Sequence, residues 1–125
     1  MRRFATEITD VAAEALELAA GGVLILFAEG APPELAEVSV LHRVATPPSA
    51  TPPAVGARLA IGGVTSQITA IGEYAWRKIG EIGHVVINFN GEGTAPRPGE
   101  ISARPVDLAA LAAALAPGAT IAVDD

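Results

Sequence analysis

The chain has 125 residues, 50% of them apolar but only 4% aromatic, and it carries a net charge of −6 with no cysteine. This length predicts one domain over residues 1–125, with a single core filled mainly by aliphatic side chains. The acidic balance argues against nucleic acid as a partner, because binding to a phosphate backbone needs a clustered basic surface. The absence of cysteine excludes disulfides, thiolate metal sites and cysteine nucleophiles.

The first half of the chain predicts three strands and two helical segments. Residues 4–11 alternate apolar and polar side chains, which is a strand pattern. Residues 11–20 are rich in Ala, Glu and Leu and stop at two glycines, which is typical of a short helix. The apolar run Val23–Ala28 has the length of a central strand. A proline opens a single helical turn over 33–36, and residues 38–44 return to a strand.

The second half begins with a stiff, proline-rich surface loop and continues with short elements. Gly62-Gly63, between two apolar runs, is a hairpin signal, and Asp107 is placed to cap a helix of aligned leucines. In chain order, the predicted elements are a loop at 45–54, strands at 58–61 and 64–71, a helix at 73–82, strands at 84–90 and 101–106, a helix after Asp107, and a last strand at 119–123.

Because strands outnumber helices and often follow each other directly, the sequence favours a mainly β fold, a compact antiparallel β-barrel or sandwich with two or three short helices. The longest apolar run, Val23–Ala28, is far shorter than the roughly 20 residues that span a bilayer. We therefore expect a soluble, cytoplasmic protein.

Two histidines are the best candidates for chemistry, because imidazole has the side-chain pKa nearest neutrality. His84 shares its strand face with asparagines, opposite Val85, Ile87 and Phe89, so it is either a functional ring or an ordinary surface histidine. His42 shares a face with valines, which is more typical of a hydrogen-bonded structural histidine than of a functional one.

Other candidates are weaker. Glu29 follows a buried strand and precedes a glycine, a common place for an active-site carboxylate, but it is equally a turn residue. Two histidines with carboxylates would suit a metal hydrolase, yet no spacing typical of metal ligands is present, and we expect no metal.

Several short blocks follow one another along nearly the whole chain. They are Leu26-Phe27-x-Glu29-Gly30-Ala31-Pro32, Leu35-x-Glu37, Leu41-His42, Ile68-Thr69-Ala70-Ile71-Gly72, Ile82-Gly83-His84-Val85, Pro98-Gly99 and Ala116-Pro117-Gly118-Ala119. In this order and spacing, the chain resembles the IIA component of the glucitol/sorbitol branch of the phosphoenolpyruvate-dependent sugar phosphotransferase system.

The resemblance implies a small cytoplasmic phosphocarrier with a β-barrel-like fold and no cofactor. Such a phosphotransferase accepts a phosphoryl group on a histidine from the carrier HPr and passes it to the sugar-specific IIB domain, for uptake and phosphorylation of glucitol/sorbitol or a related polyol. The family's acceptor histidine matches His42, and its second histidine matches His84. The IIB/IIC transporter components would be the only link to a membrane, and the sequence leaves a homodimer open. Val44 departs from the family pattern, which has a further histidine there.

A phosphorelay needs a neutral imidazole in line with the incoming phosphorus and donors for the phosphoryl oxygens. An apolar surround would keep the His42 ring uncharged. We therefore expect His42 as the catalytic residue, at a shallow depression bordered by Glu29, with His84 or Arg43 as supporting donors. Two alternatives stay open: a non-catalytic β-rich binding or regulatory module with the same fold, and the metal hydrolase.

Overall fold

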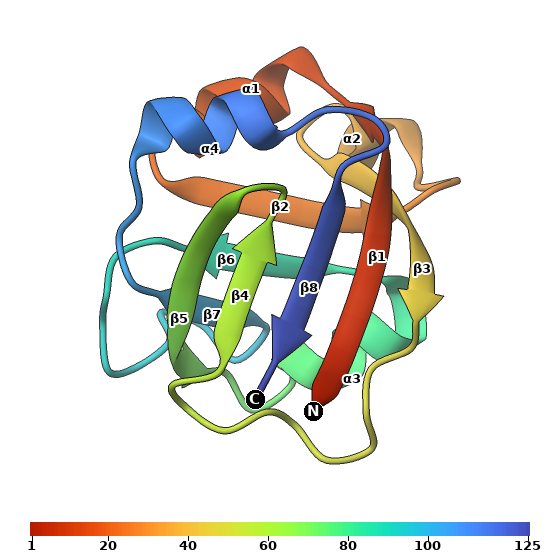
Figure 1. Cartoon of the computed structure of the whole chain (residues 1–125). Coiled ribbons are helices and arrows are strands. Elements are labelled where there is room, and N and C mark those ends of the chain that lie inside the picture. The colour runs from red at the N-terminus through yellow and green to blue at the C-terminus, as the bar shows by residue number, and fades with distance from the viewer.

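Eight strands close into a barrel in the computed structural model, which describes residues 1–125 (Figure 1). The strands are β1 (Arg2–Val11), β2 (Val23–Ala28), β3 (Val40–Thr46), β4 (Arg58–Ile61), β5 (Val64–Ile71), β6 (Val85–Asn88), β7 (Glu100–Ala103) and β8 (Thr120–Asp124). The helices are α1 (Ala13–Ala20), α2 (Pro33–Ala36), α3 (Ala75–Ile82) and α4 (Leu108–Ala114). The predicted mainly β barrel is confirmed, and α2 is the single turn expected after the proline.

Around the barrel the strand order is β1-β3-β2-β6-β7-β5-β4-β8. Most neighbours are antiparallel, but β2 pairs with β3 in parallel and β6 pairs with β7 in parallel. Parallel neighbours need a longer connection than a tight hairpin, and α2 lies within the connection between β2 and β3. This crossover places β3 between β1 and β2, and so sets the surroundings of His42.

Aliphatic side chains from all around the barrel fill its interior, as the composition predicts. Leu24, Leu26 and Ile61 are among the fully buried ones. The helices α1 and α4 lie together over one end of the barrel, and α3 lies toward the other end, where Trp76 joins the core (Figure 1). No helix is long and apolar enough to cross a membrane.

Local signals in the sequence produced the expected elements. The hairpin forms between β4 and β5 in antiparallel register, and Gly62 takes a φ of 56°, in the left-handed region that favours glycine. Asp107 caps α4, because its side chain accepts a hydrogen bond from the Ala110 amide at 3.1 Å. The alternation on β6 is also confirmed, since Val85 and Ile87 are buried while their neighbours are only half-buried.

Candidate functional site

His42 lies in β3, between β1 and β2, and its ring points into the barrel. Only 1% of the residue is exposed, and the ring meets the edge of Phe4 with centroids 6.3 Å apart. The expectation of a shallow surface depression at His42 is therefore wrong: alternation along a barrel strand places this position on the closed interior face.

Both ring nitrogens of His42 have partners. Nδ1 is 2.6 Å from the Thr6 hydroxyl, and Nε2 is 2.7 Å from the Gly83 carbonyl. A carbonyl oxygen can only accept, so Nε2 carries the proton and Nδ1 accepts from Thr6. Burial lowers the pKa of His42, against a smaller raising effect of the Gly83 carbonyl, and this keeps the ring neutral.

The apolar surround of His42 differs from the one that strand alternation predicted. Val40 is buried beside it, but Val44 is 39% exposed. The pairing of β3 with β1 has register shifts between Ala5 and Thr6 and between Ile8 and Asp10. Neither shift falls between His42 and Val44, which pair with Ile8 and Thr6, so the alternation holds there and only the exposure of Val44 differs from the expected apolar surround.

Glu29 and Arg43 form an ion pair on the outside of the barrel. The Arg43 guanidinium donates to the two Glu29 carboxylate oxygens at 2.9 and 3.1 Å, and this hydrogen bonding lowers the pKa of Glu29. The strands that carry them do pair, since the Glu29 amide donates to the His42 carbonyl at 3.0 Å. Neither side chain hydrogen-bonds to the His42 ring, because Arg43 follows His42 on the strand and so faces the opposite way.

His84 lies on the outer side of the barrel wall, immediately before β6. It is half-buried, and its ring packs against Phe27 with centroids 5.0 Å apart. Its pKa is lowered, first by burial and then by the positive charge of Lys78, while Glu100 acts in the opposite direction. The half-buried position agrees with the polar face that the sequence predicts for this residue.

Gly83 connects the two histidines without bringing their rings together. Its carbonyl accepts from His42 inside the wall, and the next residue, His84, packs outside it. Gly83 has a φ of 67°, and an added Cβ would lie 2.8 Å from the Ala28 Cβ. Sequence reasoning missed both this contact role of Gly83 and the role of Thr6, for which no local signal exists.

A hollow of about 350 Å³ opens beside His84, between α3 and the segment that leads into β7. Lys78, Arg97 and Glu100 are its charged residues. Arg97 Nη1 donates to Glu100 at 3.2 Å, and the Asn88 amide donates to the other carboxylate oxygen at 2.8 Å. No pattern in the sequence groups these residues, which come from separate elements.

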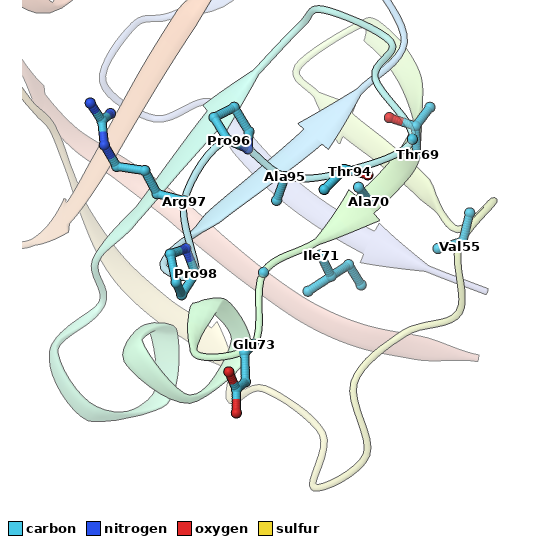
Figure 2. Close-up of a pocket in the computed structure, with 12 residues that line it drawn as sticks. Val55, Thr69, Ala70, Ile71, Glu73, Thr94, Ala95, Pro96, Arg97 and Pro98 are labelled. Atoms are coloured by element: carbon cyan, nitrogen blue, oxygen red, sulfur yellow. The ribbon is translucent and has the colours of Figure 1, made fainter.

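A second hollow, of about 450 Å³, lies between the end of β5 and the loop that precedes β7 (Figure 2). Threonines, prolines and Glu73 line it, and no histidine does. Figure 2 shows Arg97 extending away from the other labelled side chains. No group of three or more His, Asp or Glu side chains comes together as a metal site would require.

A solved structure has a similar barrel. The crystal structure of a phosphotransferase-system IIA component from Enterococcus faecalis V583 matches with a TM-score of 0.72, over 94% of this chain and 96% of that one, at 21% identity. The fold is thus that of a IIA component.

The sequence comparisons define the family. Residues 3–122 match the model of the family described as PTS system glucitol/sorbitol-specific IIA component. The glucitol/sorbitol-specific EIIA components of Escherichia coli K12 and Shigella flexneri are each 33% identical over 98 residues, 78% of this chain and 78% of theirs. The chain belongs to the glucitol/sorbitol-specific IIA family, and that membership supports a phosphocarrier role in a sugar phosphotransferase system.

Proposed function

We propose that this protein accepts a phosphoryl group from the histidine of HPr on His42 and passes it to a sugar-specific IIB domain, for phosphorylation of glucitol/sorbitol or a related polyol. Family membership supports the carrier role. The observation that carries the assignment to His42 is its uncharged ring, fixed at both nitrogens by Thr6 and Gly83.

The chemistry requires a free lone pair on the attacking nitrogen. Nε2 is the nitrogen that faces the turn between α3 and β6, so we assign the attack to it. Its proton has to be on Nδ1 at that moment, and the Thr6 hydroxyl suits this change because it can donate or accept. The Nε2–P bond then forms as the P–N bond of the donor phosphohistidine breaks, and its electron pair returns to the donor ring.

Access to Nε2 requires displacement of the Gly83 carbonyl. That carbonyl belongs to the residue that ends α3. The carbonyl accepts from the His42 ring, while the Gly83 amide donates to the Ile79 carbonyl of the last helical turn. A change confined to this turn would uncover Nε2 and leave the Thr6 contact in place. Closure of the turn afterwards would exclude water from the phosphoryl group.

The test is phosphorylation by phosphoenolpyruvate, enzyme I and HPr, followed by intact mass. We expect one acid-labile phosphoryl group on the wild type and none on His42→Gln. His84→Gln should still accept the group but transfer it onward more slowly. Circular dichroism and amide NMR spectra serve as folding controls for the two variants.

Each outcome has a distinct meaning. If folded His42→Gln takes up one phosphoryl group and His84→Gln takes up none, the acceptor is His84. If the wild type takes up none, the protein is a non-catalytic module that keeps the fold, and the proposed function is wrong.

A further inference from the structure

We propose that the hollow beside His84 is a binding site for a phosphoryl dianion, with Lys78 as its principal cation. This inference deepens the proposed function and rests on it: the group bound there is the one that a phosphorylated protein partner presents before transfer. Lys78 lies on α3, His84 follows the same helix, and Arg97 comes from the loop before β7.

Lys78 is placed in the hollow and is not neutralised there. It takes part in none of the ion pairs of the structure, which involve other cations. Its side chain packs over Gly99, so that a Cβ added to Gly99 would lie 3.1 Å from the ammonium nitrogen. The ammonium is therefore held against backbone that has no side chain to displace it.

The carboxylate at this site is already engaged. Glu100 is 7% exposed, and its two oxygens accept from Asn88 and Arg97. Arg97 uses one nitrogen in this pair and keeps further N–H donors, since its side chain is largely exposed. With one carboxylate opposite two cations, the hollow keeps a positive charge in a protein whose net charge is −6.

The His84 ring supplies an oriented group. Packing against Phe27, with the two ring planes tilted by 36°, orients it at the edge of the hollow. A neutral imidazole can donate one N–H to a phosphoryl oxygen, and a bound dianion would also stabilise the protonated ring. The combination of a free ammonium, a partly free guanidinium and a fixed imidazole is the chemistry of phosphate binding.

The place of this hollow in the fold connects it with His42. His84 follows Gly83, whose carbonyl covers Nε2 of His42. A phosphoryl group held by Lys78 and His84 would thus rest on the outer side of the turn that has to move. The other cationic hollow, of about 420 Å³ beside Arg58 and Arg104, contains no histidine and is not connected to this turn.

The experiment titrates the full-length protein with inorganic phosphate while NMR follows the imidazole signals of His84. Phosphate should give a saturable shift of His84 and raise its pKa, whereas chloride at equal ionic strength should not. Lys78→Met keeps the methylenes over Gly99 and should weaken phosphate binding about three- to tenfold. Arg77→Met is the matched control, because it removes the same charge from the adjacent residue, which pairs with Glu81.

A second arm distinguishes a protein-bound phosphoryl group from free phosphate. With phosphorylated HPr as the donor, the Lys78→Met variant should have a higher KM for the donor than the wild type. Its final uptake of one phosphoryl group should stay unchanged. Gly99→Ala should act in the same direction, since its Cβ would push the ammonium away. If Lys78→Met and Arg77→Met behave alike in both arms, the inference is overturned but the proposed function is not. If the wild type takes up no phosphoryl group but still binds phosphate, only the proposed function is overturned.

Discussion

At the scale of the residue, the unusual feature is a histidine that is buried, neutral and bonded at both nitrogens. Thr6 and Gly83 fix the plane of the His42 ring, and the interior position removes it from water. Such a ring resembles a structural histidine in every local respect. It differs in having a hydroxyl on one nitrogen, which tolerates either tautomer, and the carbonyl of a backbone turn on the other.

The buried ring predicts a pH dependence of folding stability. Burial holds the pKa of His42 below its ordinary 6.5, so the unfolded chain binds the proton more readily. The contribution is full above pH 6.5 and is lost as pH falls below it toward the lowered pKa of the folded state. Urea unfolding of the wild type should therefore show a falling free energy of unfolding below pH 6.5.

His42→Gln is the comparison, since it removes this titration and should flatten the pH slope. His84 also has a lowered pKa, but it is only half-buried, so His84→Gln should retain most of the slope. Equal slopes for the wild type and a folded His42→Gln variant would contradict the burial of a neutral ring.

At the scale of the element, the join between α3 and β6 combines a helix end, a close approach and a functional contact. Gly83 receives the helix in a left-handed conformation and packs against Ala28 of β2, while its carbonyl faces His42. The next strand, β6, then begins with Val85, whose side chain is buried in the core. One residue thus sets both the covering of Nε2 and the position of His84.

Gly83→Ala should destabilise the protein by about 2–4 kcal/mol, the sum of a left-handed alanine and an overpacked contact. Gly80→Ala on the same helix is the matched control. An added Cβ there meets nothing within 4 Å, so we expect no loss and a gain of up to about 1 kcal/mol from helix propensity. Chemical denaturation measures both, and similar values for the two variants would show that Gly83 has no special role.

At the scale of the whole molecule, barrel closure brings the two ends of the chain together. β1 pairs with β3 on one side and with β8 on the other, and the termini lie side by side (Figure 1). Two ion pairs, Arg2 with Asp124 and Arg3 with Asp125, link the two ends of the chain. The remaining surface is acidic overall, which suits docking of a partner with a basic face.

Docking between oppositely charged surfaces predicts sensitivity to salt. The rate of phosphoryl transfer from HPr at low protein concentration should fall as ionic strength rises from about 0.01 to 0.5 M, because the Debye length shortens from roughly 30 Å to below 10 Å. Stopped-flow or quench-flow transfer rates measure this effect, with an uncharged osmolyte as the control for viscosity. A rate that does not change with salt would argue for apolar docking instead.

The sequence by itself determined the elements and the mainly β class, because these depend on local patterns: the alternation on β6, the hairpin glycines before β5 and the Asp107 cap of α4. Ordered blocks along the chain also identified the family. Only the tertiary structure decided that His42 is buried, that Glu29 pairs with Arg43 away from it, and which residues surround His84. These facts depend on the parallel pairing of β2 with β3 and on contacts between residues up to 41 positions apart, such as His42 with Gly83. Local periodicity in a sequence carries no information about such distant contacts.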